Sequence, residues 1–221
     1  MSRTLIFANG AVNDGAKVQQ AIAEAHADDV QPHIMAADGG ARQAAHYGLA
    51  VHSVVGDMDS LAENEQAVLR ANGAIFHEHS PQKDETDLEL ALTLARKQGA
   101  DWVRVIGAMG QRIDQTLGNL QLLAAGQFRG YDVAIVDGDQ SVRALHAGIH
   151  QISGQPGDTI SLIPVGGAAE GVYTNGLEYS LYGETLLFGP TRGISNRLST
   201  ASASVSIRAG VLLVIHTASD A

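Results

Sequence analysis

The feature that most constrains the fold of this 221-residue chain is a change of pattern near Gly138–Ser141. Before this point, short β-rich runs alternate with segments that carry apolar residues at helical spacing. After it, the helical spacing disappears, and short alternating runs stand between glycine-rich turns. This change predicts two domains, over residues 1–139 and 140–221.

The first part predicts an α/β domain. Val18, Ile22 and Ala25 recur at helical spacing within Ala16–His26, and similar patterns favour helices over Glu63–Arg70, Leu88–Ala95 and Leu117–Leu123. Strands separated by helices indicate a mainly parallel sheet with helices on both faces. The expected strands are Thr4–Ala8, His33–Ala37, Val51–Val55, Ala74–His77, Trp102–Ile106 and Asp132–Val136.

The second part predicts an all-β domain, an antiparallel sandwich or barrel. Its candidate strands are short, and each is bounded by turn residues. They are Val142–His146, Ile149–Ser153, Thr159–Pro164, Leu177–Leu181, Thr185–Phe188, Ser202–Arg208 and Val211–His216.

Charge and composition narrow the class of partner. The formal net charge of −10 would repel a polyanion, which argues against nucleic acid. The chain has no cysteine, so any metal must bind oxygen or imidazole ligands, and a reducing compartment fits. No apolar stretch is long enough to span a bilayer, and the apolar run near Met1 is too short for a secretion signal. We therefore expect a cytoplasmic protein with no membrane partner.

Three expected strands run into turns with unusual chemistry. These turns are Asp38-Gly39-Gly40, Gly56–Ser60 and Gly107–Gly110. The carboxyl ends of parallel strands share one edge of the sheet, where ligands bind in open α/β folds, so the turns should meet at one pocket. Their glycines would let backbone N–H groups approach phosphate oxygens. Alternatively, the glycines simply end the strands.

Asp57 and Asp59 point to a cation. Two carboxylates so close in a short turn repel one another, and Mg²⁺ would remove that repulsion because it prefers carboxylate, water and phosphate oxygens. The alternative is an Asx-turn, followed by Asp59 or Ser60 as the cap of the helix near Glu63–Arg70.

A second acidic group, Lys83-Asp84-Glu85-Thr86-Asp87, again precedes a helix. Taken alone, Asp84 as the N-cap with Asp87 three residues on explains it. Together with Asp57 and Asp59 it favours a site for metal and phosphate. His77 and His79 flank Glu78 after a strand. A solvated strand end is a simpler interpretation of these residues than a metal site.

Arg112 and Asp114 follow the third turn and open a helix that contains Asn119. The guanidinium of Arg112 could bind a phosphate through two hydrogen bonds, and Asp114 could cap the helix or orient a catalytic group. An exposed Arg–Asp ion pair is the alternative.

The order of these motifs resembles the thiamine pyrophosphokinase family. The motifs are Asp38-Gly39-Gly40-Ala41, Gly56-Asp57-Met58-Asp59-Ser60, Lys83-Asp84-Glu85-Thr86-Asp87, Arg112-Ile113-Asp114 and Gly193-Ile194-Ser195-Asn196. The resemblance implies an α/β domain that binds ATP and Mg²⁺, a β domain that binds thiamine, and a homodimer with active sites at the subunit interface. The implied reaction is attack of the thiamine hydroxyl on the β-phosphorus of ATP, which gives thiamine diphosphate and AMP.

The resemblance also implies roles for particular residues. Asp57, Asp59, Asp84 and Asp87 would bind metal, and either Asp59 or Asp87 would accept the hydroxyl proton. Asp38, Gly39, Gly40, Lys83, Arg112 and Asp114 would lie near the nucleotide, with Lys83 and Arg112 stabilising the charge on its phosphates. Ser195 and Asn196 would recognise the aminopyrimidine ring of thiamine.

Three positions depart from the family pattern. Gln111 replaces a glycine, Gln115 a histidine, and Arg197 an acid after the Ser-Asn pair. A cation near a thiazolium ring is unfavourable, so Arg197 leaves a second function possible, in which the acceptor is another alcohol, such as a pterin alcohol. Gln111 and Gln115 leave a third function possible, that of a module that binds a nucleotide or the vitamin without turnover.

Overall fold

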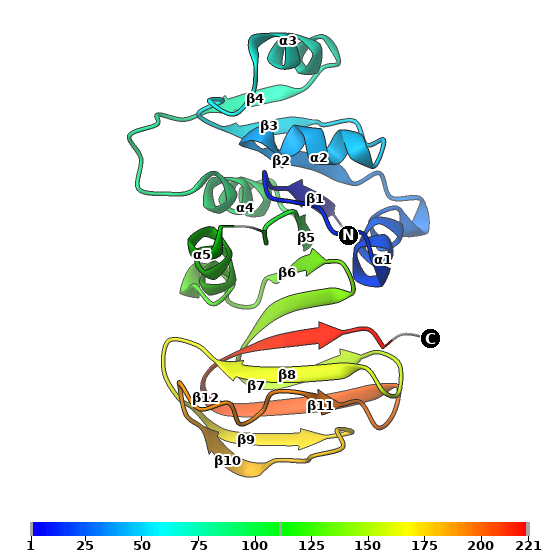
Figure 1. Ribbon diagram of the computed structural model, residues 1–221, viewed down its shortest axis with the longest axis vertical. Helices are drawn as coiled ribbons and strands as arrows, with labels where there is room; N and C mark the ends of the chain where they lie inside the picture. The colour runs from blue at the N-terminus through cyan, green and yellow to red at the C-terminus, as the bar shows by residue number, and fades with distance from the viewer. Residues whose placement is uncertain (1, 111, 220–221) are drawn as a thin grey trace. The chain divides into compact units, whose positions relative to one another are not determined.

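The computed structural model describes residues 2–110 and 112–219, and it forms two compact units (Figure 1). The first unit comprises Met1–Asn119 and Tyr131–Gly138, and the second comprises Leu120–Gly130 and Asp139–Ala221. Gln111, one of the departures named above, lies outside the described residues.

The first unit is built on a parallel sheet with the strand order β6-β5-β1-β2-β3-β4. All six strands were predicted, and their ends differ from the prediction by two residues at most. The observed bounds are β1 Arg3–Phe7, β2 His33–Ala37, β3 Ser53–Gly56, β4 Ile75–Glu78, β5 Trp102–Ile106 and β6 Asp132–Asp137.

Helices cover both faces of this sheet, as predicted; α1 and α4 lie on opposite sides (Figure 1). The α-helices are α1 Ala16–Ala25, α2 Ala41–His46, α3 Glu63–Ala71, α4 Asp87–Lys97 and α5 Ile113–Leu123, and short 3₁₀ turns are η1 Ala27–Asp29, η2 Asp38–Gly40 and η3 Gly126–Phe128. The sequence did not predict α2, because six residues are too few to show helical periodicity. Helix α5 begins in the first unit and continues into the second.

The core of the first unit follows the alternation of its strands. Ile34 and Ala36 of β2 pack with buried residues of α1 and α2, such as Val18 and Ala41. Met35, which alternates with them, is also fully buried. A sheet buried on both faces explains why these strands read as nearly continuous apolar runs.

The second unit is an antiparallel β sandwich, again as predicted. Its long strand β12 (Ser202–Thr217) pairs with β7 (Gln140–Ser153) along one edge. Two strands pair with the other edge of β12: β9 pairs with Ser204–Ala209, and β8 pairs with Leu212–Thr217. The remaining strands are β8 Thr159–Pro164, β9 Ala169–Asn175, β10 Tyr182–Leu186 and β11 Asn196–Arg197. This unit has its own apolar core, which includes Leu145, Ile160 and Val205.

Several strand predictions in the second unit were wrong. Val142–His146 and Ile149–Ser153 form one strand, and so do Ser202–Arg208 and Val211–His216. A register shift between Ile207 and Val211 interrupts the alternation of β12 without ending its pairing.

Two further corrections concern shorter segments. Leu177–Leu181 is not a strand, since Leu177 makes only an isolated bridge with Leu198. Strand β9 was missed, because Gly171 and its polar neighbours obscure the alternating pattern.

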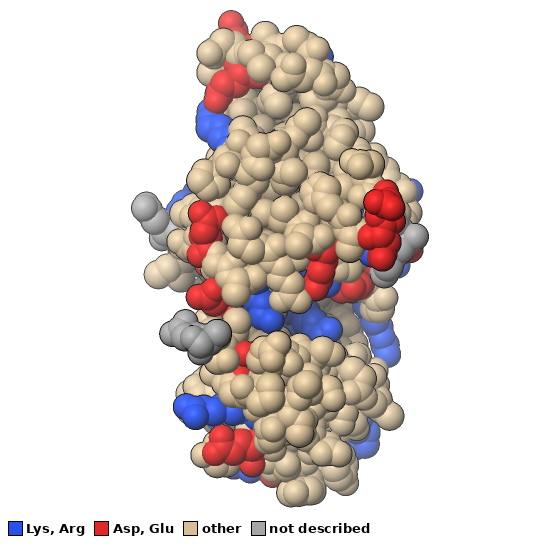
Figure 2. All heavy atoms as spheres, turned by 90° about the vertical axis from the view of Figure 1, so that its right-hand side faces the viewer, with Lys and Arg blue, Asp and Glu red and all other residues tan. Residues whose placement is uncertain are grey.

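On the face drawn in Figure 2, most of the surface is uncharged, and the acidic and basic side chains of each unit form small separate groups. Among the described helices, none has the length and apolar character needed to cross a membrane.

Candidate active site

A cleft of about 670 Å³ lies at the carboxyl ends of the strands in the first unit. The turns after β2, β3 and β5 all contribute to its wall, as the sheet-edge argument predicts. The volume is within the range of small-molecule sites. Among the predicted site residues, Asp38, Asp57, Asp59, Lys83, Asp87 and Arg112 line it.

Three of these aspartates converge. Asp38, Asp57 and Asp59 each offer a carboxylate oxygen, and these oxygens lie within 4.8 Å of one another. Asp38 is only 5% exposed, and its Oδ1 has no hydrogen-bond partner among the described residues. Burial of an unpaired carboxylate is unfavourable, and a divalent cation would remove this cost. The three side chains therefore fit a magnesium ion.

The turn that carries Asp57 and Asp59 has an unusual backbone. Met58 is buried, and its φ of 64° lies in the left-handed region. The backbone N–H of Asp59 donates to Oδ1 of Asp57 (3.2 Å), and this hydrogen bond holds the pKa of Asp57 below its usual range. Asp57 is thus charged at neutral pH.

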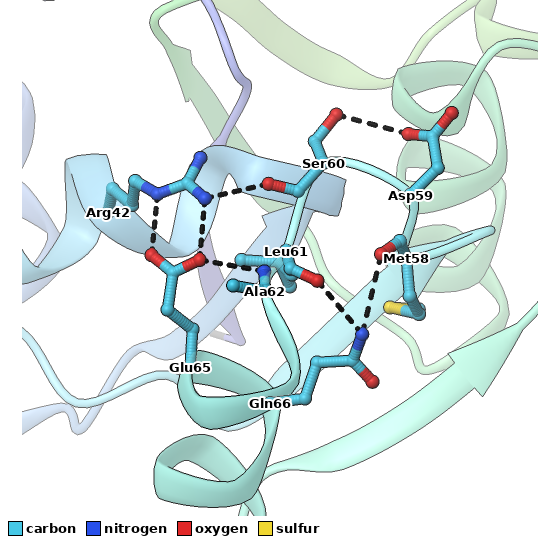
Figure 3. Close-up of polar contacts among 8 residues, drawn as sticks. All are labelled: Arg42, Met58, Asp59, Ser60, Leu61, Ala62, Glu65 and Gln66. Atoms are coloured by element: carbon cyan, nitrogen blue, oxygen red, sulfur yellow. Dashed lines mark hydrogen bonds and ion pairs between the residues drawn. The ribbon is translucent and has the colours of Figure 1, made fainter.

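A set of polar contacts from α2 and α3, here called the brace, supports this turn from outside (Figure 3). Arg42 donates to both carboxylate oxygens of Glu65 (2.6 Å each) and to the carbonyl of Ser60 (2.7 Å). Gln66 donates to the carbonyls of Met58 and Leu61. The brace comprises Arg42, Glu65 and Gln66. It fixes the path of the backbone that presents Asp57 and Asp59.

The alternative interpretation of this turn is correct in one half and wrong in the other. The hydrogen bond from the N–H of Asp59 to Asp57 is that of an Asx-turn, but neither Asp59 nor Ser60 caps α3. The N-cap of α3 is Ala62, and the side chain of Glu65 accepts its backbone N–H (2.8 Å). Ser60 instead donates its hydroxyl to Oδ1 of Asp59 (3.1 Å). The carboxylate of Asp59 is therefore left at the cleft rather than used by the helix.

Lys83 and Asp87 lie beside this carboxylate cluster. The Nζ of Lys83 is 2.7 Å from Oδ1 of Asp87 and 3.6 Å from Oδ2 of Asp57. Burial raises the pKa of Asp87; Lys83 opposes the rise, whereas Asp38 and Asp57 add to it. Asp87 is consequently a better proton acceptor than an exposed aspartate.

The N-cap of α4 is Thr86, not Asp84. The hydroxyl of Thr86 accepts the backbone N–H of Glu89 (3.2 Å), so the capping explanation for Asp84 is wrong. Asp84 is exposed and does not belong to the cleft wall described above. Its predicted role as a metal ligand stays a prediction.

Gly56 allows the carboxylates to approach one another. A Cβ atom at this position would lie 3.0 Å from Cγ of Asp87 and 3.2 Å from Cβ of Asp38. Its φ of 149° is also one that other residues rarely adopt. Gly39 and Gly40 also allow a close approach. They are buried against the end of β1 rather than exposed in the cleft.

Sequence reasoning missed the contribution of β1. Asn9 and Gly10 follow this strand and line the cleft. A Cβ atom at Gly10 would lie 2.4 Å from the carbonyl oxygen of Gly107, so the turns after β1 and β5 pack closely. The Asn-Gly pair directly after a predicted strand was the signal that could have identified this turn.

Arg112 and Asp114 form the exposed ion pair that was considered as the alternative. Arg112 lines the cleft together with Gln115, whereas Asp114 faces its partner outside the cleft wall. Asn119, on the same helix, is buried and donates to the carbonyl of Ala108 (2.7 Å). This hydrogen bond holds the turn after β5.

The histidines at the end of β4 do not join a metal cluster in the described structure. His77 is half-buried and His79 is exposed. In residues 2–110 and 112–219, one group of at least three potential metal ligands is found. It is the aspartate cluster, and it does not include these histidines.

Ser195 and Asn196 lie in the second unit, at the start of β11. Ser195 is exposed, with a φ of 61°, and its backbone N–H donates to the hydroxyl of Ser161 (3.0 Å). Asn196 is buried, and its amide bonds both the N–H and the carbonyl of Tyr179. Arg197 is exposed. The Asn196 side chain therefore holds the backbone of Tyr179, whereas Ser195 is exposed to solvent.

Two protein-family models match this chain. "Thiamin pyrophosphokinase, catalytic domain" matches residues 26–135, and "Thiamin pyrophosphokinase, vitamin B1 binding domain" matches residues 149–212. Together they cover most of the chain. The first match contains the carboxylate cluster, and the second contains Ser195 and Asn196.

Individual proteins agree with these matches. A thiamine pyrophosphokinase of Bacillus subtilis is 29% identical over 163 residues, which are 73% of this chain and 76% of that protein. The rice protein thiamine pyrophosphokinase 1 is 27% identical over 153 residues, but the match spans only 57% of its length.

Solved structures show the same fold. The crystal structure of thiamine pyrophosphokinase from Bacillus subtilis has a TM-score of 0.85 and 26% identity, over 99% of this chain and 100% of that chain. Thiamin pyrophosphokinase from Candida albicans has a TM-score of 0.76 over 98% of this chain and 89% of that chain; at 17% identity, it shows the fold alone.

Proposed function

This chain belongs to the thiamine pyrophosphokinase family, and we propose that its aspartate cluster binds the magnesium of ATP while the second unit supplies residues that recognise thiamine. The chain is a thiamine diphosphokinase, which transfers the diphosphate group of ATP to thiamine and releases AMP. The comparisons favour this activity over a pterin acceptor or a module without turnover. The observation that carries the proposed site is the convergence of Asp38, Asp57 and Asp59 in the cleft.

Asp38, Asp57 and Asp59 are the proposed ligands of magnesium. Asp57 and Asp59 were predicted as ligands, and the buried, unpartnered oxygen of Asp38 supports its addition to the set. The ion, when bound, would neutralise charge on phosphate oxygens. Within residues 2–110 and 112–219, no contact of Asp84 supports such a role.

Lys83 and Arg112 are the basic side chains at the cleft wall among the residues described. We infer that both stabilise phosphate oxygens as charge passes to the departing AMP. Arg112 must leave its ion pair with Asp114 to do so, which is easy because both side chains are largely exposed.

Asp87 is the proposed proton acceptor. The thiamine hydroxyl oxygen bonds to the β-phosphorus, and the hydroxyl proton passes to Asp87. The bond between the β-phosphorus and the oxygen that bridges it to the α-phosphorus breaks, and this oxygen leaves with AMP. The half-buried position and raised pKa of Asp87 favour it over exposed Asp59.

The second unit is the proposed source of thiamine recognition, through the hydroxyl of Ser195. Asn196 is assigned a supporting role, because its amide is occupied by the backbone of Tyr179. Arg197 is exposed, which lets it turn away from a cationic ring. The homodimer and the cytoplasmic location stay predictions, and light scattering tests the former.

Product analysis tests this function. The protein is incubated with thiamine and Mg-ATP, and the nucleotides are separated by chromatography. We expect AMP and thiamine diphosphate in equal amounts, and loss of both in Asp57→Asn. ADP as the sole nucleotide product would contradict diphosphate transfer, and unchanged turnover in Asp57→Asn would contradict the proposed cluster.

A further inference from the structure

Lys83 occupies an unusual place in the cleft. Five acidic side chains line the cleft wall, Asp38, Asp57, Asp59, Glu85 and Asp87, against two basic ones. Of these two, Arg112 is engaged by Asp114. Lys83 is therefore the cation that contacts the carboxylates of the described cleft, through Asp57 and Asp87.

Lys83 is held in the cleft by two ion pairs. Its Nζ lies 2.7 Å from Oδ1 of Asp87 and 3.6 Å from Oδ2 of Asp57. The ammonium group is well covered, since the side chain is only 14% exposed. A second cation bound to the same carboxylates would compete with Lys83 for their negative charge.

The position also overlaps with the proposed metal site. Asp57 contacts Lys83, and its carboxylate is also one of the three converging oxygens. Asp87 packs over Gly56 beside Asp38, so all four aspartates share one small volume. A divalent cation bound by Asp57 would lie near the ammonium group of Lys83 and be repelled by it.

We propose that Lys83 is the resident counter-ion of the carboxylate cluster, and that it opposes metal binding until nucleotide phosphates draw its charge away from Asp57. This inference rests on the proposed function and deepens it. It makes Lys83 a positioning residue that couples the two ligands, because phosphate oxygens that engage Lys83 relieve the repulsion felt by the metal. Metal alone should bind weakly, and metal with nucleotide should bind tightly.

The test is the affinity for Mn²⁺, measured by electron paramagnetic resonance of the free ion, with and without a non-hydrolysable ATP analogue. Without nucleotide, Lys83→Met should bind Mn²⁺ about tenfold more tightly than the wild type. The analogue should tighten Mn²⁺ binding less in the variant than in the wild type. A merely structural role for Lys83 would instead weaken metal binding in the variant.

Two further variants make the result specific. Lys97→Met removes the same charge from an exposed position at the end of α4, the helix that follows Lys83 in the chain, and its Mn²⁺ affinity should stay within about twofold of the wild type. Lys83→Arg keeps the charge and should retain weak binding of the free ion. If Lys83→Met folds poorly, the rise in its melting temperature on addition of Mn²⁺ should still exceed that of the wild type.

The outcomes separate this inference from the proposed function. Equal or weaker binding of Mn²⁺ by Lys83→Met, while the wild type binds Mn²⁺ with the analogue, would overturn the counter-ion role alone. Failure of the wild type to bind Mn²⁺ under both conditions would overturn the proposed metal site itself, and with it this inference.

Discussion

Two buried aspartates, one in each unit, have opposite surroundings. Asp38 in the first unit is 5% exposed, and one of its oxygens has no partner among the described residues. Asp158 in the second unit is 2% exposed, and both of its oxygens are bonded. They accept from the backbone of Gln155 (2.9 Å) and of Ser219 (2.9 Å), from the Ser219 hydroxyl (3.1 Å), and pair with His216 Nε2 (2.7 Å).

The difference separates a binding site from a structural one. A buried carboxylate with every lone pair satisfied stabilises the fold, because its partners are lost on unfolding. A buried carboxylate left short of partners and close to two others destabilises the fold until a ligand arrives. Asp158 therefore stabilises the sandwich, whereas the surroundings of Asp38 agree with the proposed role in binding a ligand.

The largest effect should come from Asp38→Asn. Loss of one ligand charge should lower kcat/KM about 10³-fold, which corresponds to about 4 kcal/mol of transition-state stabilisation. The free energy of unfolding without metal should stay unchanged or rise, since the repulsion among the three aspartates falls. Steady-state kinetics and urea denaturation measure the two quantities. A large loss of stability in this variant would show that Asp38, like Asp158, stabilises the fold.

The converse change is Asp158→Ala. It should lower the free energy of unfolding by about 3 kcal/mol, because it removes the buried carboxylate that pairs with His216 and accepts two backbone N–H groups. The kcat at a temperature where the variant is folded should not change. Glu178→Ala is the control, since this glutamate is exposed in the same unit. A loss of kcat in the folded variant would show that Asp158 has a direct part in catalysis.

The pH dependence of stability should differ in sign for Asp158 and Asp87. Burial raises the pKa of Asp158, but its hydrogen bonds outweigh burial and hold the pKa well below the usual range. Its stabilisation is complete above the unfolded value of about 3.9 and is lost as pH falls toward the folded value. The raised pKa of Asp87 acts in the other direction, so stability rises as pH falls through that value.

Urea denaturation between about pH 3 and pH 7 measures both dependences, from the difference between wild type and each variant. The difference for Asp158→Ala should shrink toward acid pH. For Asp87→Asn, the free energy of unfolding of the variant should exceed that of the wild type, and this difference should be largest at neutral pH. The same slope for both variants would contradict the assignment of opposite roles.

The smallest effect should come from the brace. Arg42→Gln should weaken Mn²⁺ binding about tenfold, because the turn that presents Asp57 and Asp59 loses a support without losing a ligand. Arg70→Gln is the matched control: Arg70 is also 48% exposed and pairs with a glutamate of the first unit, Glu78. Isothermal titration calorimetry compares them. Equal affinities for the two variants would show that the brace does not position the ligands.

The sequence predicted the fold best where the pattern was regular. His33–Ala37 and Trp102–Ile106 were predicted with their observed ends, because buried parallel strands read as continuous apolar runs. The failures in the second unit came from the register shift in β12 and from Gly171 in β9, where pairing continues although the pattern does not.

The site was predicted in part. The strand-end rule placed Asp38, Asp57 and Asp59 at one edge, but only the fold could show that Asp38 completes the cluster while Asp84 is exposed. Proximity across β2 and β3 is a tertiary property that spacing within one turn does not reveal. The roles of Lys83 and of Asn196 likewise depend on contacts with distant residues, Asp57 and Tyr179.

The central claim is that Asp38, Asp57 and Asp59 together hold a divalent cation against the phosphates of ATP. Crystals grown with Mn²⁺ and a non-hydrolysable ATP analogue test it through an anomalous difference map. We predict a manganese peak bounded by these three carboxylates and by phosphate oxygens. A peak elsewhere, with the nucleotide bound and the three aspartates empty, would contradict the claim.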